Sequence, residues 1–394
     1  VRVDYEHPGT QITFCEESHV TVKSWSLTYK ISTDEQEQNE QEQKQIRIRI
    51  RIRTKQKDTT IQLFVTGRMM AMYSKLGLGL LLSTLMACLV NGEDLGSWHA
   101  VASMGTSRSG HALVSLGNGR VLACGGRQGA DTYLASAELY DSRTNTWTPV
   151  ANMLTPRAAH GAAFIENGFV LIAGGYNGDS KLSSAEVYEA RTDSWIAVHN
   201  MTTGQAHLQM AQFGDGTGRI LAAGGIADPE SSLRVAAEGY DPITQHWLRV
   251  ANMSDIRDDW YSSFSMAFMP TTSATMGKVL SAGGNLGGAN ASNHLEVVAW
   301  TQVYDAVADT WQTAANMTVA RNNFGLTAID GDTMIAVGGG NANGNALDSV
   351  EVYHHKSNTW RVVTQMRRQR YLAGVAPLGN NSVLVTGGSD GRNL

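Results

Sequence analysis

The stretch from residue 104 to residue 153 reads MGTSRSGHALVSLGNGRVLACGGRQGADTYLASAELYDSRTNTWTPVANM, and its pattern recurs along the chain. An apolar run leads into Gly125 and Gly126, and Tyr140 follows, with Trp147 seven residues later and a methionine six residues beyond it. Five tyrosine–tryptophan pairs share the first spacing, and six tryptophan–methionine pairs share the second. A repeat of about 50 residues with short strands is typical of a β-propeller.

Each unit is expected to form four strands. Strand a follows a Met-x-x-x-Arg segment, strand b runs into the glycine pair, strand c carries a tyrosine and strand d carries the tryptophan. Glycine permits a tight turn with positive φ after strand b, and the tryptophan can cover the gap between neighbouring blades. The residues expected to have these structural roles are Gly125, Gly126, Tyr140, Trp147, Gly174, Gly175, Tyr188, Trp195, Gly224, Gly225, Tyr240, Trp247, Gly283, Gly284, Tyr304, Trp311, Gly338, Gly339, Tyr353, Trp360, Gly387 and Gly388.

The number of units predicts the number of blades. The units begin near residues 104, 153, 201, 253, 317 and 366. The sixth stops at Leu394, before its tyrosine and tryptophan, and Trp98 can supply its outer strand. The fourth is longer, with insertions expected at residues 270–278 and 285–299. The predicted fold is therefore all-β: a six-bladed propeller of four-stranded antiparallel blades whose last blade is incomplete in this fragment of a longer chain.

This pattern resembles that of the kelch-repeat family over residues 98–394. The double glycine, the tyrosine and tryptophan seven residues apart and the Met-x-x-x-Arg segment carry the resemblance. Two units depart from it, because Gln205 stands at an arginine position and Gln302 replaces the glutamate of a Glu-x-Tyr segment. The resemblance implies a kelch β-propeller domain.

Residues 1–68 differ from the repeat region. They contain a Glu/Gln run and an isoleucine–arginine alternation from Ile46 to Arg53, which has the period of a β-strand. The first methionine of the chain is Met69. We therefore expect residues 1–68 to be a non-native or disordered extension; the alternative is a genuine extension that precedes a signal-anchor.

Residues 69–92 have the layout of a secretory signal peptide. Lys75 precedes an apolar run from Leu76 to Val90, which is short for a transmembrane helix of about 20 residues. Cleavage near Gly92 would release residues 93–394 as the propeller. The prediction is a secreted, extracellular protein with no stable membrane insertion after signal cleavage.

Composition argues against several classes of protein. A formal net charge of −5 does not suit a nucleic-acid platform. Three cysteines cannot form a disulfide framework, and no Cys/His cluster has the spacing of a zinc site, so neither a metal nor a cofactor is predicted. Cys124 precedes a glycine pair and is expected to be a buried, inert thiol. His111 and His160 recur at one repeat position, which favours packing over catalysis.

The arginines of the Met-x-x-x-Arg segments are the first candidates for binding. They precede strand a, which is nearest the axis, and the d-to-a loops emerge on the same face as the b-to-c loops. The arginines could ring the channel mouth there, or they could satisfy backbone carbonyls and acidic neighbours inside each blade. Around Arg257, charged and aromatic neighbours favour recognition. The candidate binding residues are Arg108, Arg157, Arg257, Asp258, Asp259, Trp260, Arg321 and Arg370.

The b-to-c loops vary most between units, and variable loops on a rigid scaffold commonly carry recognition. Five Asn-x-Ser/Thr sequons also occur, and three of them share one repeat position. If occupied, their glycans would lie on the arginine face and shift binding to the channel mouth or to the other face. The predicted glycosylation sites are Asn200, Asn252, Asn290, Asn316 and Asn380.

These observations predict an extracellular module that binds a protein ligand through loops on one propeller face. No nucleophile elbow, P-loop or HExxH motif occurs, so no catalytic residue is assigned and no enzyme is predicted. Two alternatives stay open. One is a secreted carbohydrate-acting enzyme, epimerase-like or oxidase-like, with an axial site. The other is a kelch substrate-adaptor fragment of the ubiquitin-ligase type that lacks its BTB and BACK part.

Overall fold

The computed structural model describes the backbone of four strands between residues 11 and 66 and most of the chain from residue 97 onward. The later described ranges are residues 97–129, 131–214, 216–227, 237–253, 260–270, 277–287 and 296–391. The chain divides into two units, Val1–Asp94 and Leu95–Leu394. Every described regular element is a β-strand, and the described residues contain no helix long and apolar enough to cross a bilayer.

The first unit contains one antiparallel sheet. Its strands, in sheet order, are β1 (Gln11–Glu16), β2 (Lys23–Thr33), β3 (Gln45–Arg53) and β4 (Asp58–Thr66). The isoleucine–arginine alternation lies within β3, in agreement with its strand period. The origin of residues 1–68 stays a prediction, and the predicted signal peptide, residues 69–92, lies outside the described residues.

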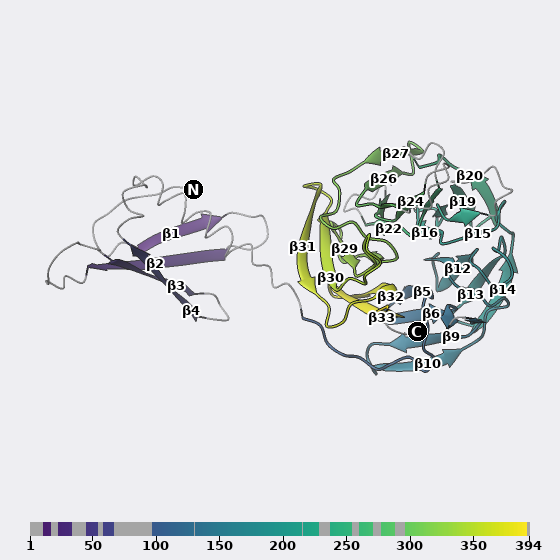
Figure 1. Cartoon of the computed structure of the whole chain (residues 1–394), viewed down its shortest axis with the longest axis horizontal. Helices are drawn as coiled ribbons and strands as arrows, with labels where there is room; N and C mark the ends of the chain where they lie inside the picture. The colour runs from purple at the N-terminus through teal and green to yellow at the C-terminus, as the bar shows by residue number, and fades with distance from the viewer. Residues whose placement is uncertain are drawn as a thin grey trace. The chain divides into compact units, whose positions relative to one another are not determined.

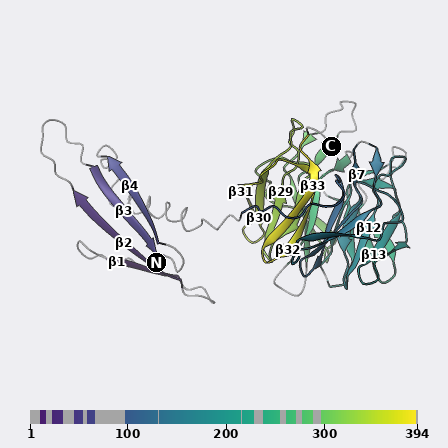
Figure 2. The same ribbon diagram turned by 90° about the horizontal axis from the view of Figure 1, so that it is seen from below.

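The second unit is a ring of sheets around one axis (Figure 1). Five sheets have four antiparallel strands in the order a, b, c, d, and the sixth has two. The predicted all-β propeller is confirmed: five blades are complete, and the sixth position, predicted to hold an incomplete blade, holds a hairpin. In Figure 2 the blades are seen edge-on, with the short strand β7 (Arg127–Gln128) at one face.

The strands of the blades follow the predicted order along the chain. Blade one contains β5 (Ala112–Gly117), β6 (Arg120–Cys124), β9 (Ala137–Asp141) and β10 (Thr146–Val150). Blade two contains β11 (Gly161–Phe164), β12 (Phe169–Ala173), β13 (Ala185–Glu189) and β14 (Ser194–Val198). Blade three contains β16 (Gln209–Gln212), β17 (Ile220–Ala223), β19 (Glu238–Asp241) and β20 (His246–Arg249).

The remaining blades have the same order. Blade four contains β22 (Ser265–Met269), β23 (Lys278–Ala282), β26 (Thr301–Asp305) and β27 (Thr310–Thr313). Blade five contains β28 (Gly325–Ala328), β29 (Thr333–Val337), β30 (Ser349–His354) and β31 (Thr359–Gln365). The sixth unit contains β32 (Tyr371–Gly379) and β33 (Ser382–Ser389).

The core lies between blades rather than within them. Six clusters of buried apolar side chains each join two consecutive units, and one of them joins the sixth unit to blade one through Leu384 and Val121. The tyrosine and tryptophan of each complete blade lie opposite each other in the ladder, with ring centroids 4.9–5.1 Å apart. A single blade would leave its apolar faces exposed to solvent, so the ring is the stable unit.

The glycine pairs allow neighbouring blades to approach closely. Gly174 has a φ of 70°, and a Cβ there would lie 2.6 Å from the carbonyl oxygen of Gln205 in the next unit. The N–H of Gly175 donates to that same oxygen at 2.7 Å. The sixth unit repeats this contact, because Gly388 N–H donates to Arg108 O of blade one at 3.4 Å. The glycine pair therefore also closes the ring.

A ring of main-chain hydrogen bonds encircles the axis at one face. In five units it involves the residue two positions after the arginine position, and in the fourth unit it involves Ser263, six positions after Arg257; all six residues have φ between 48° and 61°. Five such bonds join consecutive units, including Gly110 N–H to Leu372 O at 3.2 Å, which connects blade one to the sixth unit. The six residues of this ring are Gly110, Ala159, His207, Ser263, Asn323 and Leu372.

The sixth unit lacks the two outer strands among the described residues. Trp98, like Val383 and Val385 of β33, packs against the buried cluster at the junction of blade five with the sixth unit, so it lies at this blade as expected. Residues 97–104 nevertheless form no strand. The physical reason is that strand c, which would connect β33 to this segment by hydrogen bonds, is not among the described elements.

Candidate functional site

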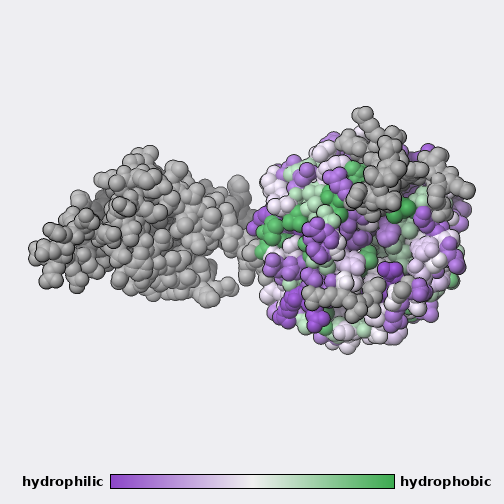
Figure 3. Space-filling view, in the orientation of Figure 1, coloured by the Kyte–Doolittle hydropathy of each residue, from purple (hydrophilic) through white to green (hydrophobic). Residues whose placement is uncertain are grey.

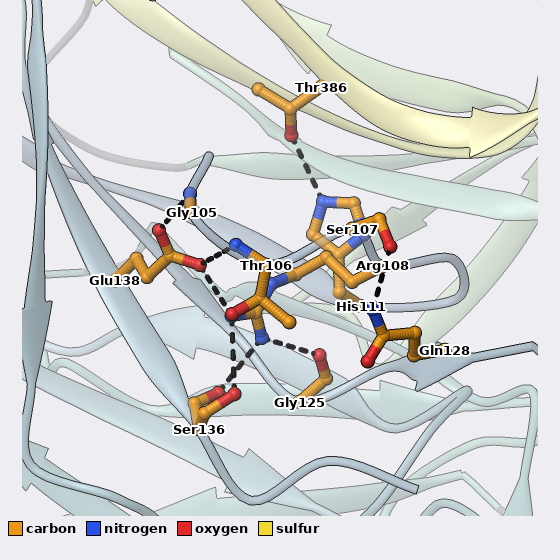
Figure 4. A network of polar contacts seen from close by, with 10 residues as sticks. All are labelled: Gly105, Thr106, Ser107, Arg108, His111, Gly125, Gln128, Ser136, Glu138 and Thr386. Atoms are coloured by element: carbon orange, nitrogen blue, oxygen red, sulfur yellow. Dashed lines mark hydrogen bonds and ion pairs between the residues drawn. The ribbon is translucent and has the colours of Figure 1, made fainter. Parts of the chain in front are cut away.

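The arginine positions hold a repeated network inside the blades (Figure 4). Arg108 Nη1 donates to the carbonyl oxygens of Gly125 and Ser136, at 2.8 and 2.9 Å. Its Nη2 contacts Glu138 Oε1 at 2.8 Å. The same carboxylate accepts backbone N–H groups from Gly105 and Thr106. Burial opposes ionisation, but these hydrogen bonds hold the pKa of Glu138 below its usual value.

Arg157 and Arg321 make the same contacts. Arg157 binds Glu186 at 2.7 Å and Arg321 binds Glu351 at 2.6 Å. The arginine side chains of these two pairs and of Arg108 are 0% exposed. Of the two alternatives for these arginines, the structure therefore shows the one in which they satisfy backbone carbonyls and an acidic neighbour inside the blade, and the channel-mouth alternative is wrong for all three. They join strands a, b and c of one blade, because strand c supplies the carboxylate.

The other candidate positions differ. Arg370 is half-buried and donates to Gly387 O at 3.0 Å. Arg257, Asp258 and Asp259 lie outside the described residues. The backbone of Trp260 begins β21 (Trp260–Ser262), which pairs with β24 (Asn285–Gly287) in a short extra sheet completed by β25 (Glu296–Val297). The predicted insertion at residues 285–299 therefore contributes to this sheet.

The histidines and the cysteine of the first two units are buried. His111 Nε2 lies 3.0 Å from Thr386 Oγ1 of the sixth unit, and His160 Nε2 lies 3.8 Å from Cys124 Sγ. Burial lowers the pKa of both histidines to about 3 and raises that of Cys124 to about 12. All three groups are therefore neutral at physiological pH, and the expected burial of Cys124 is confirmed.

A cavity of about 320 Å³ lies on the axis and is lined by strand a of all six units. Its titratable lining residues are His111, His160 and His207. Burial, followed by the charge of Arg127, lowers the pKa of His207 as well. No carboxylate, amine or thiol lines this cavity among the described residues. Nor do three or more His, Cys, Asp or Glu side chains cluster as metal ligands anywhere in the described ranges.

The described parts of the b-to-c loops form a layer that we call the loop face. It comprises the described parts of residues 127–136, 176–183, 226–234, 285–299 and 340–348. The residue after each glycine pair bonds back to the segment before strand a, as at Ser109 with Arg127 and Asn322 with Gly340. The same loop residue often pairs again within its own loop, as Gly340 does with Ala346. These pairings form short sheets that include β7 with β8 (Thr132–Tyr133) and β15 (Gln205–Ala206) with β18 (Ile226–Ala227).

Aromatic and amide groups lie on this face. Tyr133 of blade one and Tyr176 of blade two pack edge to face, with ring centroids 5.5 Å apart. Asn322 donates from Nδ2 to Asn285 Oδ1 at 2.7 Å and connects two blades. The repeat pattern could not reveal the tyrosine pair, because these two positions differ between units. In Figure 3, hydrophobic residues are interspersed with hydrophilic ones over the visible face of the propeller.

Four predicted glycosylation sites are described and exposed. Asn200, Asn252 and Asn316 lie in d-to-a linkers, and Asn380 lies in the turn between β32 and β33. Asn290 lies outside the described residues. Exposure makes these asparagines accessible, and their occupancy stays a prediction.

The fold and these contacts define a class, the β-propellers built from glycine-pair repeats with buried arginine–glutamate pairs. The chain carries kelch repeats: its residues 107–154 and 320–367 match the Kelch motif. Kelch-like protein 36 of Rattus norvegicus is 34% identical over 114 residues, or 29% of this chain and 18% of that protein. An F-box/kelch-repeat protein of Arabidopsis thaliana is 33% identical over 85 residues, or 22% of each chain.

A further relative is Kelch-like protein 7 of Mus musculus, 34% identical over 91 residues, which cover 23% of this chain and 15% of that protein. The matched segments thus span at most 22% of the length of these three relatives. The similarity concerns the repeats.

Proposed function

We propose that the protein is an extracellular protein-binding module that takes its partner on the loop face. The observation that carries the proposal is the layer of short sheets, which orders the described parts of the variable loops above a scaffold of repeated blades. Pre-ordered loops lose little conformational freedom on binding, so they suit recognition. The tyrosine pair supplies apolar area with a polar rim, as interface centres commonly do.

A site-specific cross-linking experiment tests the use of this face. A photo-reactive amino acid is placed at Gln128 or at Asn343, which are exposed on loops of blades one and five. The control position is Thr192, exposed in the c-to-d turn on the opposite face. We expect both loop-face positions to capture the same protein from extracellular fluid while the control captures none. Capture from Thr192 alone would place the interface on the other face.

Secretion is tested separately. Expression from Met69 in a eukaryotic secretory cell is expected to release a product into the medium with its amino end near Glu93. Retention in the membrane with residues 1–68 intact would contradict the extracellular part of the proposal. That outcome would not affect the cross-linking experiment, which could then be done with extract from another cellular compartment.

A substrate-adaptor fragment is the second candidate. The similarity to an F-box/kelch-repeat protein favours it, because that name joins the same repeats to another domain. Failure of secretion, together with specific cross-linking from cytosolic extract at Asn343, would favour the adaptor.

The axial enzyme has less support. The three histidines of the cavity have lowered pKa values, and the described lining offers no acidic partner for acid–base catalysis. Turnover of a sugar that disappears in His207→Ala, with the fold retained, would favour the enzyme.

A further inference from the structure

The inner edge of strand a faces the axial cavity. In the five complete blades strand a pairs only with strand b, while the d strands, such as β14 and β31, lie at the rim of the ring (Figure 1). Consecutive side chains of β16 pack at opposite junctions: Met210 belongs to the buried cluster shared with blade two, and Ala211 belongs to the one shared with blade four. The edge that remains toward the axis is therefore main chain.

The lining of the cavity agrees with this geometry. Unbroken runs of residues line it, such as residues 110–115 of blade one and 159–164 of blade two. Side chains alone would not form such runs, because successive side chains of a strand point to opposite sides. Backbone N–H and C=O groups alternate along a free strand edge, and those away from bulk water need hydrogen-bond partners. The cavity of about 320 Å³ is therefore surrounded by main-chain donors and acceptors.

The described lining of the cavity carries no formal charge. It includes no Asp, Glu, Lys or Arg residue, and burial keeps His111, His160 and His207 neutral by lowering their pKa values. Neutral amides, those of Gln209 and Asn323, are among its polar side chains. An ionised ligand would lose its hydration there without gaining an opposite charge. The cavity therefore favours neutral ligands over charged ones.

The main-chain ring forms the mouth of this cavity on the side of the loop face. All six ring residues line the cavity. Blades three and five contribute His207 and Asn323 to the ring, whereas blades one and two contribute only Gly110 and Ala159. The small residues make the mouth widest beside blades one and two.

We propose that the axial cavity binds a neutral ligand rich in hydroxyl groups, of the size of a monosaccharide, which enters through this mouth. Each hydroxyl both donates and accepts, so it matches an edge on which N–H and C=O groups alternate. A compact ligand with hydroxyls on all sides contacts several strand edges at once, whereas an extended peptide would pair with one edge or two. The cavity volume also lies at the small end of the range for small-molecule sites. This is binding without turnover, and it does not depend on the function proposed for the loop face.

Isothermal titration of the full chain tests the class of ligand. The matched probes are glucose and glucuronate, in which a carboxylate replaces the CH₂OH group. We expect glucuronate to bind at least about 100-fold more weakly, because its charge has no partner in the described lining. Since the change is in the ligand, altered folding of the protein cannot cause the difference. Equal binding of the two probes, or no binding of glucose, galactose, mannose or myo-inositol, would overturn the proposal.

Hydrogen exchange with bound glucose locates the site. We expect alternate amides of strand a to gain protection in several blades at once, including residues 161–164 and 209–212, while those of residues 194–198 in β14 do not change. Protection confined to the loop face or to a single strand would overturn the proposal.

The mouth is tested with a double variant, Gly110→Asn with Ala159→Asn. Both positions have positive φ, which asparagine tolerates, and Asn323 is the natural residue at the equivalent position of blade five. A Cβ at Gly110 would lie 3.7 Å from Ala159 N, an ordinary contact distance. We expect the association rate of glucose to fall about 10-fold in the double variant. The control, Gly117→Asn, changes an exposed glycine with a φ of 80° on the opposite face and should keep the rate. An unchanged rate in the double variant would overturn entry through this mouth.

Maltotriose distinguishes two sources of the same chemistry, a free sugar and the terminal sugar of a glycan. If the ligand is the end of a glycan, the remaining sugars extend out through the mouth, and maltotriose protects the same amides as glucose. If the ligand is a free sugar, glucose protects these amides and maltotriose does not. Both results support a polyhydroxyl site on the axis.

Discussion

Blade two and the sixth unit start from the same hairpin and differ in what surrounds it. Both present a glycine pair to the next unit and both contribute to the main-chain ring at the axis. Blade two adds two strands, a buried ion pair and a tyrosine–tryptophan pair, whereas the sixth unit has none of these among its described residues. Closure of the ring therefore depends on the inner hairpins, and the outer strands stabilise each blade.

The outer strands also fasten each blade to its neighbour. Asp193 Oδ1 accepts from Tyr188 OH of its own blade and from the N–H of Ala151 in the preceding linker, both at 2.9 Å. Trp195 Nε1 donates to the carbonyl oxygen of the same Ala151 at 2.8 Å. Burial and Asp193 raise the pKa of Tyr188, so the phenol stays a donor. Four residues thus connect two blades at the rim.

The largest expected effect on stability comes from replacing the arginine of blade two, and the same replacement in the sixth unit is expected to cost much less. Arg157→Met leaves Glu186 buried without its partner, and we expect the free energy of unfolding to fall by about 3–5 kcal/mol. Arg370→Met removes a half-buried side chain with one hydrogen bond, so a loss of about 1 kcal/mol or less is expected. Urea unfolding of both variants measures the contrast. Similar losses would mean that the sixth unit contains a full ion-pair network after all.

The next effect concerns the contact between blades. Gly174→Ala combines a φ of 70° with a collision against Gln205 O, and we expect a loss of about 2–4 kcal/mol. The control is Gly117→Ala, which has a φ of 80° but nothing within 4 Å of the added Cβ, and its expected cost is about 1 kcal/mol. Equal costs in thermal unfolding would show that backbone strain alone, and no close approach, requires the glycine.

The pH dependence of stability tests the two buried histidines at the junctions of blade one: His160 at the junction with blade two and His111 at the junction with the sixth unit. The pKa of His160 is lowered to about 3 in the folded state, so below pH 6.5 the unfolded chain binds a proton that the folded chain does not. Stability therefore falls as the pH falls from 6.5 toward 3, by about 1.4 kcal/mol per pH unit. His160→Leu, which installs the residue found at the equivalent Leu208, should remove about 2 kcal/mol of the loss between pH 6 and pH 4.

The measurement is urea unfolding at both pH values. His111, whose pKa is also about 3, is the companion site at the junction with the sixth unit. An unchanged pH dependence in His160→Leu would contradict the assignment of His160 as a buried neutral side chain.

The smallest effect tests the rim. Asp193→Ala removes the acceptor of two hydrogen bonds, and we expect a loss of about 1–2 kcal/mol in chemical unfolding. Asp193→Asn is expected to be nearly neutral, because asparagine fills the same position in blades one and five. A marked loss in the Asn variant would mean that the negative charge, rather than the acceptor oxygen, connects the blades.

Spacing in the sequence was sufficient to predict the fold. Tyrosine and tryptophan seven residues apart pair across strands c and d, and the glycine pairs end strand b, as expected. The roles of Arg108, Arg157 and Arg321 needed more than spacing, because their acceptors lie about 30 residues away in strand c. A signal did exist: a Ser-x-Glu segment, as at Ser136 and Glu138, occurs in the three units that bury an arginine.

The loop face was predictable only as a location. Loop connectivity of an antiparallel blade sets which loops share a face, so residues 127–136 and 176–183 could be grouped in advance. The packing of Tyr133 against Tyr176 depends on backbone pairings of the individual loops, and no repeat encodes them. Likewise, Trp98 could be assigned to the sixth unit, but its lack of strand structure follows from the absence of a partner strand among the described residues.

Hydrogen exchange at the axis tests the central claim most directly, namely that the inner hairpin of the sixth unit closes the ring. The amides of Gly110 and Leu372 donate across the two junctions of the sixth unit, and those of Ala159 and His207 donate across junctions between complete blades. The account predicts protection of all four amides within about 10-fold of one another. Protection of Gly110 and Leu372 that is about 100-fold lower than that of Ala159 and His207 would contradict it, because the ring would then open at the sixth unit.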